Sequence, residues 1–210
     1  MNRWTLISIA FLFSFCTKKE RFPIPEAPVI HSQSAVSKNA DTLWISPKSK
    51  VFWKGTKMRK LGKHEGEVLF ESGYLLVSDT TPIAGYLVAN MQTIRVTDIP
   101  ETDPVPLKEL TEHLKNPDFF EVNVFPKAYF DLVHFAPKKG NIWTLSGNLI
   151  IKGISNPVSI VATRNGTTWT CDFEIDRFAW NIAFEGSWAD RTLVDRKIQL
   201  RVVLELEKKQ

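Results

Sequence analysis

The segment with the most side chains suited to chemistry covers residues 54–73, KGTKMRKLGKHEGEVLFESG. In it His64 stands between Gly62 and Gly66, after five basic side chains and before an apolar run. A histidine so placed can bind a metal or move a proton, and it can equally stand in a turn where a basic loop leads into a β-strand. Glu65 points to the opposite face of that strand, and no cysteine or carboxylate stands at a metal-ligand spacing around His64. The segment therefore predicts a turn and no metal site.

The other candidates for chemistry are scattered along the chain. His113 belongs to a helical segment and His134 to a strand, and the sequence contains no H-x-H or H-E-x-x-H pair. It also contains no G-x-S-x-G and no paired-carboxylate motif, which argues against an enzyme. Cys171, in WTCDFEI, shares its strand parity with apolar residues, so a small buried residue is a better interpretation than a nucleophile. We expect no catalytic residue.

A period of two dominates the chain after residue 41 and predicts β-strands. Residues 197–207, KIQLRVVLELE, alternate between an apolar and a charged face, and residues 143–153, WTLSGNLIIKG, behave in the same way. Arg164-Asn165-Gly166 predicts a hairpin between the two strands that follow. Earlier strands are expected over residues 43–55, 65–78, 83–94 and 128–135.

One segment has a helical period instead. Leu107, Leu110 and Leu114 recur at i, i+3 and i+7 after a proline-rich entry, and Asn116-Pro117 ends the segment. Eight antiparallel strands with one short helix fit a sandwich or a barrel, and the chain of neighbouring hairpins favours a closed barrel, which leaves no open edges. We therefore expect an all-β, eight-stranded antiparallel barrel. Its interior is just wide enough to be filled by side chains or to hold one small ligand.

Composition limits the class of protein. A chain of 210 residues, 43% of them hydrophobic and with 14 Phe and 7 Trp, is sufficient for one domain with a large core. The net charge of +4 comes from 27 basic and 23 acidic residues that are spread along the chain, without the basic arm of a nucleic-acid-binding protein. We expect no nucleic-acid partner.

Residues 1–16 predict an export signal. The apolar run from Trp4 to Phe15 is too short to span a membrane as a helix, but it has the length of a signal-peptide core. Cys16 follows directly and resembles the bacterial lipoprotein pattern, in which the signal is cut before a cysteine that is then acylated, although most such sites have Gly, Ala or Ser where Phe15 stands. A plain secretory signal and an uncleaved anchor are the alternatives. We expect an exported protein of the periplasm or cell envelope, anchored to the membrane as a lipoprotein through Cys16.

Residues 17–41 mix Pro, Ser, Lys and Ala without a sustained period and predict a flexible linker, so the folded domain is expected over residues 42–208. Four separated segments of this domain resemble, in order, the signature segments of the YceI-like, polyisoprenoid-binding family: SKVFWKGTKMRKLGKHEGEVLFESGYL, LTEHLKNPDFFEVNVFPKAYFDL, SGNLIIKGISNPVSI and FEIDRFAWNI. The resemblance implies an extended, lipocalin-like barrel of eight antiparallel strands with a helix near one barrel end. It also implies a periplasmic or secreted protein that holds a long prenyl chain inside the barrel.

Individual residues carry this resemblance. The matching positions are Trp53, Lys57, His64 and Gly66 in the first segment, His113, Leu114, Asp118, Phe119 and Phe120 in the second, 147–153 in the third and Asp176-Arg177 in the fourth. The sequence FAWNIAF after Arg177 departs from the family pattern, in which a glycine soon follows the arginine. We expect Asp176 and Arg177 either to pair with each other or to cap a loop.

A prenyl chain is apolar, and each methylene-sized group that it buries is worth roughly 0.8 kcal/mol, so a dry tunnel binds it with little polar recognition. Strand parity selects the following candidate lining residues: Trp53, Phe70, Leu87, Met91, Phe130, Leu149, Ile151, Ile160, Phe173, Ile175 and Val202. Ordinary core packing uses the same side-chain types and stays open as an alternative for each of them. His113, Phe119 and Phe120 are expected to form a lid over a barrel end, with a helical plug as the alternative.

The basic turn with Lys57, Lys60, Lys63 and His64 can meet a phosphate head group, and a solvated loop is the alternative. The predicted function is the binding, sequestration or transport of an isoprenoid or other long-chain apolar lipid, with no cofactor apart from such a lipid. A structural or stress-response envelope lipoprotein with a filled barrel and an enzyme that acts on a lipid are the alternatives. The expected partners are the apolar lipid and the membrane through the lipid anchor, and a homodimer is left open.

Overall fold

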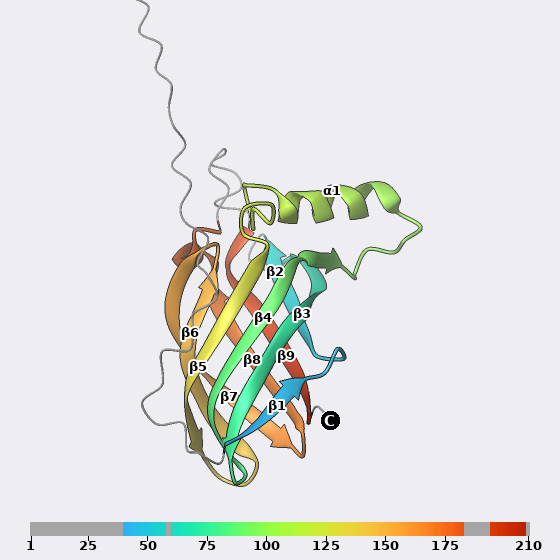
Figure 1. Cartoon of the computed structure of the whole chain (residues 1–210). Helices are drawn as coiled ribbons and strands as arrows, with labels where there is room; N and C mark the ends of the chain where they lie inside the picture. Colours follow the sequence, from blue (N-terminus) through green and yellow to red (C-terminus); the bar gives the residue numbers. More distant parts are fainter. Residues whose placement is uncertain (1–39, 58–59, 183–193, 209–210) are drawn as a thin grey trace, which may run out of the picture.

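The chain folds into a closed antiparallel β-barrel with one α-helix across one end (Figure 1). The computed structural model describes residues 40–57, 60–182 and 194–208. Its strands are β1 (Asp41–Ile45), β2 (Lys50–Lys57), β3 (Gly62–Ser78), β4 (Thr81–Val96), β5 (Lys127–Pro137), β6 (Ile142–Ile151), β7 (Ile154–Asn165), β8 (Thr168–Asp176) and β9 (Val194–Glu207). The helix α1 covers Pro104–Lys115, and a 3-10 turn, η1, covers Arg177–Trp180. The signal expected over residues 1–16 and nearly all of the expected linker lie outside the described residues, so both stay predictions.

The barrel has eight strand positions. Strands β2 to β9 pair in chain order, and β9 pairs back with β2 to close the sheet. The short strand β1 pairs with β3 and β9, which are also the two neighbours of β2, so β1 and β2 share one position. The predicted all-β, eight-stranded antiparallel barrel with one short helix is confirmed.

The strand expected over residues 43–55 is interrupted by residues 46–49. Pro47 brings no N–H with which to continue a ladder, and the chain leaves the sheet there. The buried hydroxyl of Ser49 accepts a hydrogen bond from the Glu205 backbone N–H (2.9 Å) and donates one to the Glu205 carbonyl (3.3 Å). The backbone N–H of Ser46 donates to the same carbonyl (2.7 Å). The interruption is therefore held against β9 by specific hydrogen bonds.

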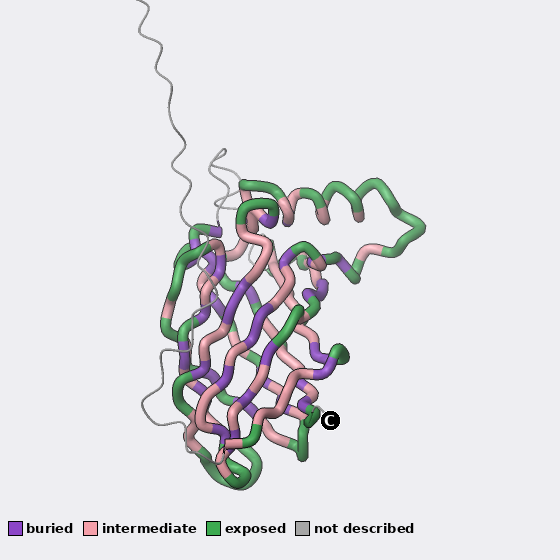
Figure 2. Tube along the Cα trace, viewed as in Figure 1, coloured by how far each residue is buried: buried purple, intermediate pink, exposed green. Residues whose placement is uncertain are grey.

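Two apolar clusters occupy different halves of the barrel interior. The cluster nearer α1, here called the α1 half, includes Leu114 of the helix together with Met91, Leu149 and Ile175 of the wall. The cluster of the other half, the far half, is built around Leu75, Leu132, Leu145, Trp169 and Leu204. Buried positions recur along the strands of the wall in Figure 2, as expected where one face of every strand points inward. The two halves are distinguished because the cavity described below lies in the α1 half.

The wall is joined least extensively between β7 and β8. These strands are in register over four positions, Ala162–Asn165 with Thr168–Cys171, whereas β6 and β7 are paired over ten. Beyond this stretch η1 contacts both strands. The Asn156 side-chain amide of β7 donates to the Ala179 carbonyl (2.9 Å), and the buried Trp180 indole donates to the Leu149 carbonyl of the neighbouring strand β6 (3.0 Å). Side chains therefore close the part of this seam that lacks a hydrogen-bonded ladder.

A buried guanidinium holds η1 in this position. Arg177 is 1% exposed and donates hydrogen bonds to the backbone carbonyls of Ile182 (2.8 Å), Val194 (3.2 Å) and Asp195 (3.2 Å). Burial lowers the pKa of Arg177, and the nearby Asp176 carboxylate opposes that shift. The side chain joins the end of η1 to the beginning of β9, two segments that the barrel alone does not connect.

Asp176 has a different set of partners from those of Arg177. Its carboxylate accepts a hydrogen bond from the Phe178 backbone N–H (3.2 Å) and one from Arg196 Nε (2.6 Å), and these lower its pKa. Asp176 is thus the N-cap of η1, which agrees with the loop-capping alternative for this pair.

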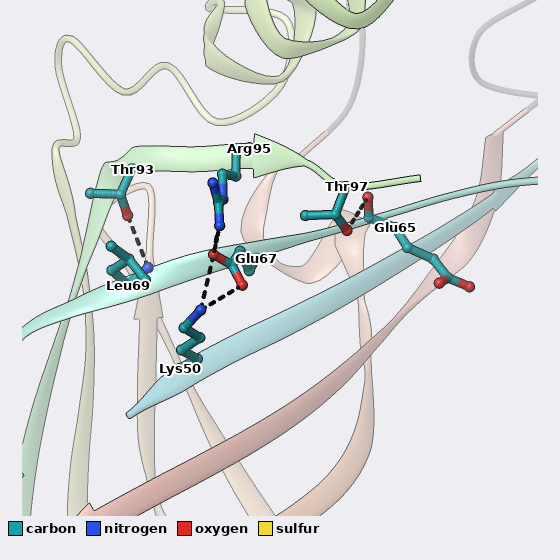
Figure 3. A network of polar contacts seen from close by, with 7 residues as sticks. All are labelled: Lys50, Glu65, Glu67, Leu69, Thr93, Arg95 and Thr97. Carbon is teal, nitrogen blue, oxygen red and sulfur yellow. Dashed lines mark hydrogen bonds and ion pairs between the residues drawn. The ribbon is translucent and has the colours of Figure 1, made fainter. Parts of the chain in front are cut away.

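A polar network on three strands fixes the pairing of β2, β3 and β4 (Figure 3). Glu67 of β3 is buried and accepts hydrogen bonds from Lys50 Nζ (3.1 and 3.3 Å) and Arg95 Nε (2.9 Å). The register between β3 and β4 shifts immediately after Glu67, and there Thr93 Oγ1 accepts from the Leu69 N–H (2.9 Å). Burial alone would raise the pKa of Glu67, but the hydrogen bonds from Lys50 and Arg95 outweigh burial and lower it.

Candidate functional site

The α1 half of the barrel contains a cavity of about 410 Å³. Strands β2, β3, β4, β5, β6, β8 and β9 contribute to its wall, and Leu110, His113 and Leu114 of α1 cover its mouth. The volume falls within the range of small-molecule pockets, which is about 300–1,000 Å³. The barrel is therefore hollow in one half.

The wall of this cavity is apolar because of strand parity. Leu149 and Ile151 of β6 point inward together, as do Phe173 and Ile175 of β8, and the register places Leu149 opposite Phe130 of β5. Side chains of the intervening positions point outward, where Lys197, Gln199 and Arg201 of β9 form pairs with acidic residues of β8. A surface of this kind excludes water and gains binding energy from apolar contact.

Nearly all of the lining residues predicted from the sequence lie on this one cavity. They are Trp53, Phe70, Leu87, Met91, Phe130, Leu149, Ile151, Phe173, Ile175 and Val202, with His113, Phe119 and Phe120 at the α1 end. Ile160 is the exception: it is buried, but it belongs to the far half, where it lies opposite Leu145. Parity predicted correctly that Ile160 points inward, but it carries no information about depth along the barrel axis.

Further lining residues were missed by the sequence analysis. They include Val51, Val68, Ala89, Ile94, Ala128, Ile198 and Leu200 on the strands and Leu110 and Leu114 on α1. Ala89 shares its parity with Leu87 and Met91, and Ile198 and Leu200 share theirs with Val202, so the same alternation could have found them. Small and aliphatic residues thus make up much of the wall.

The far half is filled by side chains. Trp143 and Trp169 meet edge to face with ring centroids 5.7 Å apart, and Cys171 is buried beside them in the same cluster. Burial raises the pKa of the Cys171 thiol to about 12, so it stays protonated and unreactive at neutral pH. This agrees with the interpretation of Cys171 as a small core residue.

The mouth of the cavity carries the polar side chains. His64 Nδ1 lies 3.2 Å from Asp98 Oδ2, and Lys63 Nζ lies 2.8 Å from Glu65 Oε1, a hydrogen bond that raises the pKa of Lys63. Lys57, Lys63 and His64 line the mouth. Lys60 is exposed and does not line it. Three of the four side chains named for the basic turn therefore line the mouth, and Lys60 does not.

His64 has a carboxylate partner that the sequence did not reveal, because Asp98 is remote in the chain and approaches only through the pairing of β3 with β4. Two side chains do not make a metal site. Among the described residues there is no group of three or more His, Cys, Asp or Glu side chains that could hold a metal ion.

Aromatic rings border the mouth beside α1. Phe119 and Phe120 follow the helix and meet edge to face at 5.0 Å, and the Phe119 ring lies 5.6 Å from the His113 ring. Phe119 is buried and packs into the α1-half cluster, whereas Phe120 is partly buried at its edge. The segment expected to form a lid thus covers part of the opening.

Comparison with known proteins identifies the family of this chain. A model of the YceI-like domain matches residues 45–206, which is most of the barrel. The chain belongs to the YceI-like family. No match was found among curated proteins.

Solved structures with the same fold include BcnA of Burkholderia cenocepacia and a YceI protein of Campylobacter jejuni. BcnA is 24% identical, with 77% of this chain and 97% of BcnA covered and a TM-score of 0.60. The C. jejuni protein is 16% identical, with 67% and 84% covered and a TM-score of 0.51. Within the described residues, no helix is long and apolar enough to span a membrane.

Proposed function

We propose that this protein binds a linear isoprenoid or a similar long-chain apolar lipid in the cavity of the α1 half and carries or sequesters it in the bacterial cell envelope. The observation behind the proposal is the cavity of about 410 Å³ in the barrel, walled by apolar side chains of seven strands. Each methylene-sized group buried there contributes roughly 0.8 kcal/mol, so a chain of several isoprene units binds without a dedicated polar partner.

The polar groups are placed where a lipid head group would be. Lys57, Lys63 and His64 stand at the mouth, whereas Met91, Leu149 and Ile175 line the interior. A chain whose apolar end enters first would therefore leave its polar end beside these side chains and in contact with water. This arrangement supports a carrier over the alternative of a structural barrel filled throughout, because a barrel filled by side chains would contain no cavity.

Location in the envelope is part of the proposal and depends on residues 1–16. An apolar run followed by Cys16 is typical of exported lipoproteins. We infer that the mature protein is anchored through an acylated Cys16 and that the linker holds the barrel close to the membrane from which it would take its lipid. The partners are then an apolar lipid and the membrane surface.

Enlarging one lining residue tests the function. Leu149 points into the cavity, so Leu149→Trp should fill ligand space; Val161, on the outer face of β7, offers Val161→Trp as a control that adds an indole outside the barrel. Delipidated protein is titrated with geranylgeraniol by calorimetry, and its melting temperature is measured on the same preparation. We expect Leu149→Trp to bind at least tenfold more weakly with an unchanged or higher melting temperature, and Val161→Trp to bind like the wild type.

Two results would contradict the proposal. The first is a wild-type protein that binds no prenol and yields no lipid on extraction from its own membrane. The second is a Leu149→Trp variant that is destabilised by about 1–3 kcal/mol, the usual effect of overpacking a filled core, without a change in binding.

A further inference from the structure

The cavity ends part-way along the barrel. On three strands the innermost lining residue is followed by an inward residue that belongs to the far half and does not line the cavity: Val202 is followed by Leu204 on β9, Phe173 by Cys171 on β8, and Phe130 by Leu132 on β5. This change from lining to packing is found on strands from different parts of the wall. The cavity is therefore a pocket with one closed end.

Five side chains form this closed end, and we call them the floor: Phe70, Leu87, Phe130, Phe173 and Val202. Each of them lines the cavity on one side and belongs to, or packs against, the far-half cluster on the other. Three of the five are phenylalanines, which fill the cross-section of an eight-stranded barrel more completely than aliphatic residues do. Below them the Trp143 and Trp169 rings occupy the interior.

The depth of the pocket follows from strand geometry. On β9 the lining runs from Val194 at the mouth to Val202 at the floor. At about 3.3 Å per residue and a strand tilt of roughly 40°, this span corresponds to about 20 Å along the barrel axis. By proportion with an apolar cavity of about 150 Å³ that holds one benzene, a cavity of the size found here holds on the order of 16 carbon atoms, or about three isoprene units.

We propose that the floor sets the length of chain that this protein encloses, so that it takes about three to four isoprene units and a longer chain leaves its remaining units at the mouth beside α1. The inference rests on the proposed function and adds a selectivity to it: the apolar end of the chain enters first, and contact with the floor ends the gain in affinity per added unit. The ligand class is a linear isoprenoid, recognised by length at its apolar end.

Changing the floor should change this length. Phe130→Ala or Phe173→Ala removes a phenyl ring of six carbons, about the size of one isoprene unit, and opens space toward the far half. Phe173→Leu removes less side-chain volume and keeps the test possible if Phe173→Ala does not fold. Ala89→Phe acts in the opposite sense, because Ala89 lines the wall above the floor. Ile160→Ala is the matched control: it removes a buried side chain of the far half that does not touch the cavity.

The experiment measures the affinity of delipidated protein for linear prenols of two to ten isoprene units. For the wild type we expect affinity to rise several-fold with each unit and to level off after about three to four. The chain length at which affinity levels off should increase by about one unit in Phe130→Ala and Phe173→Ala, and by less in Phe173→Leu. It should decrease by about one unit in Ala89→Phe. Ile160→Ala should keep the wild-type chain length.

Failure of this inference differs from failure of the proposed function. If the wild type binds prenols but its affinity keeps rising through the longest chain, or if Phe173→Leu and Ala89→Phe leave the plateau where it was, the floor does not set the length and the inference is overturned, although lipid binding stands. A shift of the plateau in Ile160→Ala would equally overturn it, because the effect would then come from loosened packing. A wild type that binds none of the prenols would refute both.

Discussion

Replacing Arg177 tests how much the contacts that join η1 to the beginning of β9 contribute to stability. The guanidinium donates to three backbone carbonyls, of Ile182, Val194 and Asp195, and is itself almost fully buried. Arg177→Met keeps much of the side-chain volume but removes the hydrogen bonds to one buried carbonyl, of Ile182, and to two partly buried ones, of Val194 and Asp195. Arg177→Lys keeps the charge but can replace at most part of the planar, three-way contact.

The magnitude follows from the number of acceptors that are left unpaired. An unsatisfied buried polar group costs about 1–3 kcal/mol, and removal of the buried charge returns part of that cost, so we expect Arg177→Met to lower the free energy of unfolding by about 3–5 kcal/mol. For a domain of this size the loss corresponds to a fall in melting temperature on the order of 10 °C. Arg177→Lys should lose about 2–4 kcal/mol, because two carbonyls stay unpaired.

Urea unfolding followed by tryptophan fluorescence provides the measurement, since Trp180 lies in the same turn. Arg196 offers the matched control: its side chain is 68% exposed and pairs with Asp176, so Arg196→Met should cost no more than about 1 kcal/mol. Equal losses in Arg177→Met and Arg196→Met would refute the reasoning, because the three carbonyl contacts would then contribute nothing beyond a surface ion pair.

Two further predictions concern Glu67 and Cys16. The pKa of Glu67 is lowered in the folded state. The contribution of Glu67 to stability is therefore complete above the ordinary glutamate pKa and is lost as the pH falls through the folded pKa. Glu67→Gln should cost about 1–2 kcal/mol in urea unfolding at pH 7 and much less at pH 3, and an equal cost at both pH values would contradict this. Cys16→Ser should move the protein from the membrane to a soluble exported fraction, whereas membrane retention with an unprocessed N-terminus would show that residues 4–15 act as an anchor.

The sequence predicted the wall of the barrel well, because every strand has one face in the interior and one in water. That alternation identified the inward face of β6 from Leu149 and Ile151, and of β8 from Phe173 and Ile175. The break between β1 and β2 could have been anticipated from Pro47, which cannot donate to a ladder. Parity says nothing of height along the axis, and for this reason Ile160 was expected on the cavity and lies in the far half instead.

Other features of the site depend on contacts between remote segments. Asp98 reaches His64 only because β3 pairs with β4, and Arg177 finds its acceptors at Ile182 and at the beginning of β9. Neither contact has a local signature in the sequence. The sequence pattern also could not show whether the barrel is hollow. Phe173 at the floor and Trp169 in the packed half are both aromatic and lie on the same face of β8, so the pattern does not distinguish them.

The short register between β7 and β8 also bears on self-association. Where their pairing stops, these strands have main-chain groups that a fully laddered barrel would satisfy within its own wall, and such groups are a template on which a second chain can add a strand. Trp180, packed against the seam by Arg177, covers this region, and Pro157 removes one main-chain donor from β7. Damage to Arg177 would then be seen first as aggregation at high protein concentration, and the arginine would serve to keep neighbouring barrels apart.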